Sequence, residues 1–144
     1  MKDKIIAFLM NFMRVEVAVA GIIEDKGKIF LTKRNRALVE GGKWCLPGGH
    51  VDKWERAEDA MKRELKEETG LDARSARLLF VHEEFDRRLN LHAIVFIYKL
   101  SVKGKAKKSW EVKESRWFTR KEIEKMNMAF THSQMLDKYW KMKK

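Results

Sequence analysis

The chain has little cysteine and proline, and it has no long apolar run. Its single cysteine, Cys45, cannot form an intrachain disulfide, so the sequence does not point to an oxidising compartment. We expect Cys45 to be a buried small residue beside the Leu46-Pro47 turn. No apolar stretch approaches the roughly 20 residues that cross a bilayer, which argues against a membrane-spanning helix. These absences predict a cytoplasmic protein without membrane contacts.

The first thirteen residues are the most apolar part of the chain. Lysines precede the apolar run Ile5–Met13, as they do in a signal peptide. Arg14 and Glu16 interrupt the pattern, however, and cleavage after it would remove Val15–Ala20, which alternates as a strand does. We therefore interpret residues 1–13 as an extension, either a short helix or an extra edge strand. It is expected to pack on the domain or on a partner subunit.

Acidic residues are few relative to basic ones. The chain has 32 lysines and arginines against 21 aspartates and glutamates, a formal net charge of +11, and lysines cluster in 103–108 and 138–144. Such an excess favours polyanionic partners, from a phosphorylated small molecule to RNA. No aromatic residues alternate with the lysines in an identifiable groove, so RNA is the less favoured partner. A solvated lysine-rich surface is the simpler interpretation.

The chain of 144 residues is long enough for one domain, 1–144, with a real core. Alternation and apolar runs predict five strands: Val15–Glu24, Lys28–Lys33, Ala76–Glu83, Leu91–Leu100 and Glu111–Phe118. The turn Asp25-Lys26-Gly27 predicts that the first two form a hairpin, and the apolar third and fourth are expected to be central. Capping-box patterns at Thr119/Glu122 and Thr131/Gln134 predict a short helix and a C-terminal helix within 131–144. This pattern predicts an α/β (α+β) fold, an α/β/α sandwich with a mixed central sheet.

The most informative stretch is Gly49–Leu71, GHVDKWERAEDAMKRELKEETGL. If Ala57–Thr69 is one helix, Glu64, Glu67 and Glu68 lie at i, i+3 and i+4 on one narrow face. The same side carries alanine, methionine and leucine residues typical of a core. The glutamates therefore continue the buried stripe of the helix and do not belong to its solvated side.

The charges around these glutamates are unbalanced. The basic residues of the helix are expected to point the other way, although Arg63 can pair with Glu67 at i, i+4. Glu64 and Glu68 have no basic residue three or four positions away, and they repel one another at i, i+4. Partly buried, unpaired like charges are costly unless something compensates them. A hard divalent cation with oxygen ligands, Mg²⁺ above all, suits this role.

The order of residues in this stretch resembles the complete Nudix box: Gly49, five residues, Glu55, seven residues, Arg63-Glu64-Leu65, one residue, Glu67-Glu68, one residue, Gly70-Leu71. The preceding Trp44–Gly49 is similar to the family's strand and turn into the box, and the resemblance spans roughly Val15 to Ile123. It implies the Nudix fold and a Nudix hydrolase. Such an enzyme cleaves a diphosphate linkage in X-linked nucleoside diphosphates with Mg²⁺ or Mn²⁺.

The resemblance also implies roles for a catalytic set made of Glu64, Glu67, Glu68, Arg63 and Glu55. The three helix glutamates hold the metal, with the main-chain carbonyl of Gly48 as a further ligand. The resemblance also implies that Glu64 orients or deprotonates the attacking water, although the general base differs among family members. The other two residues resemble the pair that orients the ligands. A further glutamate before Trp117 completes the metal site, either Glu111, which is slightly favoured, or Glu114.

Candidate substrate contacts lie outside the box. Arg34 and Arg36, in the loop that ends at Gly42, could meet a phosphate, although surface arginine is the simpler role. Many family members have glycine where this chain has Trp54, whose indole either lies over the site or packs on the start of the helix. His92 shares a strand face with three apolar residues, where a lone histidine is more often a core or rim residue than a ligand.

The sequence says less about the substrate. The turn Pro47–His50 resembles family members that act on nucleoside triphosphates, and the short chain has no added N-terminal domain as many ADP-sugar enzymes do. We favour a nucleoside triphosphate pyrophosphatase of the MutT type, followed by an ADP-ribose or dinucleoside polyphosphate hydrolase. A non-catalytic nucleotide- or RNA-binding Nudix-fold protein is the alternative of another class, and the complete set of box carboxylates weighs against it. The resemblance makes a homodimer plausible.

Overall fold

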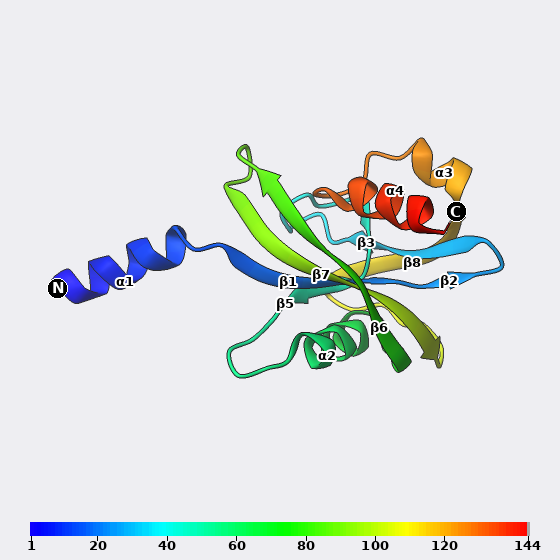
Figure 1. Cartoon of the computed structure of the whole chain (residues 1–144), viewed down its shortest axis with the longest axis horizontal. Coiled ribbons are helices and arrows are strands. Elements are labelled where there is room, and N and C mark those ends of the chain that lie inside the picture. Colours follow the sequence, from blue (N-terminus) through cyan, green and yellow to red (C-terminus); the bar gives the residue numbers. More distant parts are fainter. Residues whose placement is uncertain (144) are drawn as a thin grey trace.

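The computed structural model describes residues 1–143, apart from the side chain of Asn11. The helices are α1 (Lys2–Phe12), α2 (Ala57–Thr69), α3 (Arg120–Glu124) and α4 (His132–Met142). The strands are β1 (Glu16–Ile22), β2 (Glu24–Asp25), β3 (Lys28–Arg34), β4 (Trp44–Cys45), β5 (Gly48–His50), β6 (Asp72–Asp86), β7 (Leu91–Lys103) and β8 (Val112–Thr119). Figure 1 shows α2 on one side of the strands and α3 and α4 on the other.

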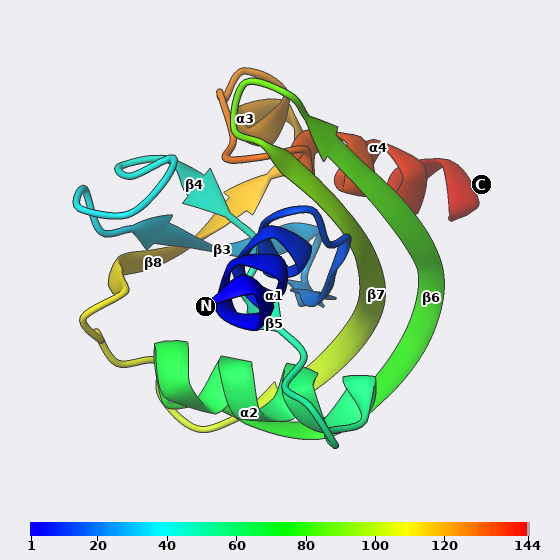
Figure 2. The same cartoon turned by 90° about the vertical axis from the view of Figure 1, so that its left-hand side faces the viewer.

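The strands form two four-stranded sheets. In the first, the order is β5-β1-β7-β6, and β1 runs parallel to β7 while β5 and β6 run antiparallel to their neighbours. In the second, β3 pairs with β2, β4 and β8. In Figure 2 the long, curved β6 and β7 run side by side, with α2 and α4 at opposite ends of the view. The predicted α/β/α sandwich with a mixed sheet is confirmed.

The apolar core has two parts, one under each helical layer. Ala60, Met61 and Leu65 of α2 are buried with side chains of β1 and β7. Met135 and Leu136 of α4 are buried in the other part, with strands of both sheets. The buried stripe of α2 is thus the one predicted from its period, and this stripe fixes which way the helix presents its glutamates.

The ends of the helices follow the sequence signals in two of three cases. Gly70 ends α2 with φ of 75° and donates its N–H to the Lys66 carbonyl, as a left-handed glycine cap does. The predicted capping box of α3 is present between Thr119 and Glu122. The capping box predicted at the start of α4 is wrong. The side chain of Thr131 makes no cap hydrogen bond there, because its hydroxyl is engaged by β6.

Three strand predictions need correction. The first predicted strand is interrupted at Ile23, so that β1 belongs to one sheet and the two-residue β2 pairs with β3 in the other. The hairpin is therefore limited to this short end. The strand predicted over 76–83 extends to 72–86, so Glu84 lies in β6, and it is an edge strand and not a central one. Long-range pairing with β7 determines this length, and local alternation does not reveal it.

Residues 2–12 form a helix, which settles one of the two alternatives for the N-terminal extension. Figure 1 shows α1 projecting away from the domain, and its apolar side chains are exposed. Near its end, Phe8 and Phe12 line a cavity of about 320 Å³ together with Asn90 and His92. Packing of α1 on a partner subunit stays a prediction. None of the helices described in residues 1–143 has the length and apolar character that a membrane crossing requires.

Candidate metal centre

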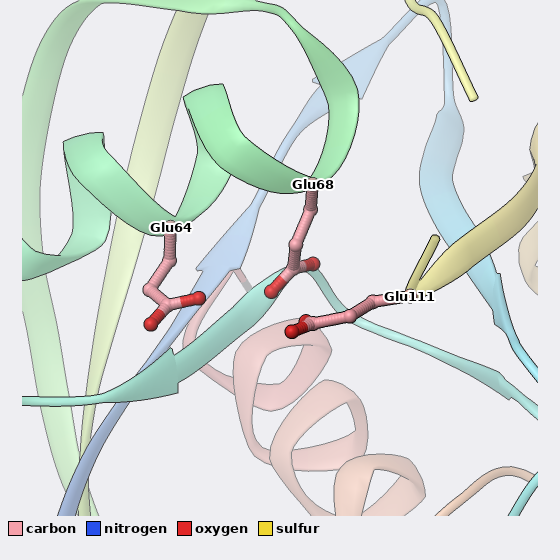
Figure 3. A group of neighbouring side chains, drawn as sticks. All are labelled: Glu64, Glu68 and Glu111. Carbon is pink, nitrogen blue, oxygen red and sulfur yellow. The ribbon is translucent and has the colours of Figure 1, made fainter. Parts of the chain in front are cut away.

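Three carboxylates from two distant parts of the chain converge at the edge of a cavity. Carboxylate oxygens of Glu64, Glu68 and Glu111 all lie within 4.8 Å of one another. Figure 3 shows the first two extending from α2 towards β5, and Glu111 approaching from the segment before β8. The helix therefore supplies two of the three groups, and the residue that directly precedes β8 supplies the third.

Burial disfavours the charged form of the two carboxylates on α2. Glu68 is only 7% exposed, and burial, followed by repulsion from Glu64 and Glu111, raises its pKa well above the usual range. The Gly48 backbone hydrogen bond opposes this shift. Burial also raises the pKa of Glu64, against the effect of the Arg63 guanidinium. Oxygen donors of high negative charge density, without cysteine or histidine, fit a hard cation such as Mg²⁺ or Mn²⁺.

Two glycines allow β5 to pass directly beneath these carboxylates. A Cβ atom on Gly49 would lie 2.4 Å from Cδ of Glu64, and one on Gly48 would lie 2.1 Å from the main-chain oxygen of Val19. Neither position has room for a side chain, so glycine is required here by close approach. The approach brings the Gly48 main chain next to Glu68. Whether the Gly48 carbonyl binds metal stays a prediction.

Its position on the helix suggested that Arg63 points away from the acidic face. The structure shows that its guanidinium contacts this face. Its Nη1 donates to Oε1 of Glu64 at 3.0 Å and to Oε2 of Glu67 at 3.1 Å. The side chain of arginine is long enough to reach back from the neighbouring helical face. The interpretation of Glu64 as unpaired is therefore wrong, whereas Glu68 forms no ion pair with any basic residue in the described part of the chain.

Arg63 is itself held in a fixed orientation. Its Nε and Nη2 donate to the two oxygens of Glu55 at 2.7 and 2.9 Å, a bidentate pair, and Nη2 also donates to the His50 carbonyl at 3.1 Å. Because this guanidinium favours the charged carboxylate, the pKa of Glu55 is lowered. Arg63 thus joins Glu55 to Glu64, and the predicted role of Arg63 and Glu55 in orienting Glu64 for catalysis stays a prediction.

The remaining acidic candidates lie differently. The side chain of Glu67 is 59% exposed, and among residues 1–143 its described link to the trio runs through Arg63. Glu114 pairs with Arg116 on β8 and does not line the cavity. Of the two glutamates proposed to complete the site, the structure thus brings Glu111 to the helix carboxylates. Its position just before β8, set by the pairing of β8 with β3, accounts for this.

A cavity of about 490 Å³ opens from the carboxylates, with a volume typical of small-molecule sites. Arg34 lines it, donating from Nε to the Val39 carbonyl at 2.8 Å while its guanidinium lies 4.8 Å from the centre of the Phe130 ring. Arg36 is exposed and does not line this cavity.

His92 stacks on Phe85, with ring centres 4.4 Å apart, and lines the smaller cavity next to α1.

Trp54 neither covers the site nor packs on the start of α2. Its side chain is 94% exposed, and its backbone has φ of 70°. This left-handed conformation favours glycine, which gives a physical reason for the glycine that the Nudix-box resemblance leads us to expect at this position. The left-handed turn directs the indole to solvent, where Lys53 Nζ lies 5.3 Å from the ring centre.

Sequence reasoning gave no role to two buried polar residues of the cavity, Glu84 and His132. Nδ1 of His132 accepts a hydrogen bond from the Leu46 N–H at 3.0 Å. A signal was present in β6, where His82 and Glu84 alternate with residues of the other face. The strand predicted from the sequence ends at Glu83, so this alternation did not place Glu84 on the same strand face as His82.

The burial of His132 predicts an acid-sensitive fold. Burial lowers the pKa of His132 from 6.5 to about 4. As pH falls below 6.5, this histidine therefore becomes protonated in the unfolded chain while it stays neutral in the folded protein, and this difference favours unfolding. Stability is therefore lost between pH 7 and pH 5, by about 2 kcal/mol from this group. Urea unfolding at both pH values is expected to show this loss in the wild type and a smaller loss in His132→Asn. Equal losses would contradict the assignment, and exposed His50→Asn is the matched control.

Comparisons with known proteins agree with this geometry. The family model for the NUDIX domain matches residues 13–139. An ADP-ribose pyrophosphatase of Methanocaldococcus jannaschii is 37% identical over 133 residues, which cover 92% of this chain and 77% of that protein. An 8-oxo-dGTP diphosphatase of Proteus vulgaris is 36% identical over 58% of this chain and 76% of its own length. A crystal structure of a MutT Nudix hydrolase from Burkholderia pseudomallei superposes with a TM-score of 0.73 at 29% identity, covering 85% of this chain and 95% of that one.

The chain belongs to the Nudix family. It is a pyrophosphohydrolase that acts on nucleotide derivatives, as the Nudix-box resemblance implied.

Proposed function

We propose that this enzyme hydrolyses the diphosphate linkage of ADP-ribose or a closely related nucleoside diphosphate derivative, with Mg²⁺ or Mn²⁺ held by Glu64, Glu68 and Glu111. One observation carries the proposal. Three carboxylates lie within 4.8 Å of one another beside a cavity of about 490 Å³ in a chain whose family hydrolyses nucleotide derivatives. Like charges this close, one of them buried, need a cation when all three are ionised.

The chain's own groups define the proposed mechanism. When bound, a divalent ion would neutralise charge on the phosphoryl oxygens and activate water. Glu64, oriented by Arg63, is proposed to position the attacking water and accept its proton. Glu67, whose carboxylate is linked to that of Glu64 through Arg63, is proposed as an additional ligand beyond these three glutamates. The Gly48 carbonyl is proposed as a further ligand.

Two substrate classes are supported by different relatives. The ADP-ribose pyrophosphatase matches nearly the whole chain, which favours ADP-ribose. The 8-oxo-dGTP diphosphatase matches little more than half of it, and this match supports nucleoside triphosphates as the second candidate. In both cases the bond broken joins two phosphoryl groups, so the proposed catalytic residues serve either substrate.

The test is a steady-state comparison of ADP-ribose, ATP and 8-oxo-dGTP with Mg²⁺, with products separated by chromatography. We expect AMP and ribose 5-phosphate from ADP-ribose, with kcat/KM about tenfold or more above that for the triphosphates, a margin that one or two well-placed contacts supply. Chelation of the metal should abolish turnover. Faster release of pyrophosphate from a triphosphate would overturn the substrate assignment, and metal-independent turnover would overturn the mechanism.

A further inference from the structure

Glu84 is a buried carboxylate in the catalytic cavity that the proposed reaction does not use. It is 5% exposed, lines the same cavity as the metal-centre glutamates, and lies outside the metal-ligand group. Thr131 donates twice to its Oε2, from the backbone N–H at 3.0 Å and from Oγ1 at 2.7 Å. These two hydrogen bonds fix the orientation of the carboxylate at the cavity wall, and a role in ligand recognition would explain why a buried carboxylate is held there.

The hydrogen bonds around Glu84 leave one oxygen available. Nε2 of His82 lies 2.9 Å from Oγ1 of Thr131, and a hydroxyl that donates to Glu84 accepts from this histidine. The chain of donors therefore runs from His82 through Thr131 to Oε2. Within residues 1–143, Oε1 accepts no hydrogen bond from protein. This oxygen is not one of the buried, unpartnered polar atoms in the described part of the chain, so it is open to solvent in the cavity that Glu84 lines, where a donor on a ligand can replace water.

The surroundings of Glu84 suit a flat ring. In the sheet, Glu84 pairs with Ala93, and Ala93 pairs with Glu16, so a small side chain stands next to the carboxylate. The guanidinium of Arg34 lies over the Phe130 ring, and both residues line the same cavity. Base-sized rings stack on such aromatic and guanidinium planes. A nucleobase placed here would present its edge to the sheet.

We propose that Oε1 of Glu84 accepts a hydrogen bond from the exocyclic amino group of the substrate's nucleobase, so that this residue selects amino-bearing over oxo-bearing bases. The inference rests on the proposed function, because it assumes that the cavity holds the nucleoside half of the substrate. An oxo group at the same position would bring two acceptors together without a proton between them. A site built for a donor rejects such an analogue strongly.

The test compares nucleotide pairs in which the exocyclic amino group is replaced either by an oxo group, with a proton added to the neighbouring ring nitrogen, or by hydrogen. Binding of AMP against IMP, CMP against UMP, and GMP against IMP is measured by calorimetry with Mg²⁺ present, which requires no turnover. In the wild type, we expect the amino-bearing member of at least one pair to bind about 10- to 100-fold more tightly, the range for a hydrogen bond to a charged group. The pair that separates identifies the base class.

Glu84→Gln gives the sharpest result. The amide oxygen can keep both Thr131 donors, which places the NH₂ group towards the ligand, so the preference should be lost or reversed in favour of the oxo base. Exposed Glu83→Gln on the same strand is the matched control and should keep the wild-type ratio. If Glu84→Gln fails to fold, Thr131→Val tests the inference instead. It removes one of the two donors that orient the Glu84 carboxylate, so it should reduce the ratio of the affinities for amino-bearing and oxo-bearing nucleotides.

Three outcomes overturn the inference: no pair separates beyond about twofold, no nucleotide binds, or Glu84→Gln keeps the wild-type ratio. Failure of the proposed function looks different. A clear amino preference that Glu84→Gln removes, without hydrolysis of any diphosphate substrate, would support the base contact and reject the catalytic proposal.

Discussion

Replacing Glu68 with glutamine is expected to lower kcat by about 1,000-fold or more while the melting temperature of the metal-free protein stays level or rises. The loss follows because a buried ligand of the proposed metal loses its charge, and a metal ion supplies several kcal/mol of charge stabilisation in the transition state. The protein keeps its stability because the substitution removes a buried like charge within 4.8 Å of two others. Steady-state kinetics with Mg²⁺ and thermal unfolding in chelator measure the two effects.

The combination is diagnostic, because most substitutions of buried residues reduce activity by destabilising the fold. Glu58→Gln is the matched control on the same helix, where its exposed carboxylate lies 3.8 Å from Lys62 Nζ. We expect near wild-type kinetics from this variant. A Glu68→Gln enzyme with more than a tenth of the wild-type rate, or one that melts several degrees lower in chelator, would argue against a metal ligand at Glu68.

A comparison of Glu111→Gln with Glu114→Gln is expected to separate two residues that lie three positions apart. Glu111 reaches the helix carboxylates, so its substitution should lower kcat by about 100-fold, comparable to the loss of one preorganised electrostatic group, and raise the Mg²⁺ concentration needed for half-maximal rate. Glu114 pairs with Arg116 and should leave the rate within about twofold. Mg²⁺ titrations of the initial rate provide both numbers.

The reverse order of effects would show that the segment before β8 rearranges in the working enzyme. Wild-type rates in both variants would remove the start of β8 from the metal centre altogether. In that event the proposed site would be confined to the glutamates of α2.

The helix that carries the proposed site was predictable because its signals are local. The period of α2, its glycine cap and its apolar stripe all lie within one stretch, so the directions of Glu64 and Glu68 followed from helical geometry. The nomination of Glu111 came from a resemblance, since spacing did not separate it from Glu114. The pairing of β8 with β3 is what places it.

The parts that the sequence did not reveal depend on contacts between distant segments. Glu84 falls just outside the strand predicted over 76–83, because β6 is extended by its pairing with β7, which no local pattern encodes. Thr131 carried the signature of a helix cap, but the carboxylate of Glu84 competes for its hydroxyl. Arg63 was assigned to the wrong side because a long side chain can reach around a helix.

Crystals grown with Mn²⁺ and AMP test the central claim most directly, since anomalous scattering locates the manganese independently of the protein. We predict an ion about 2.0–2.2 Å from carboxylate oxygens of Glu64, Glu68 and Glu111, the range for small divalent cations bound to oxygen. Manganese bound elsewhere, with these three side chains turned towards solvent, would contradict the claim that they form the metal centre of this hydrolase.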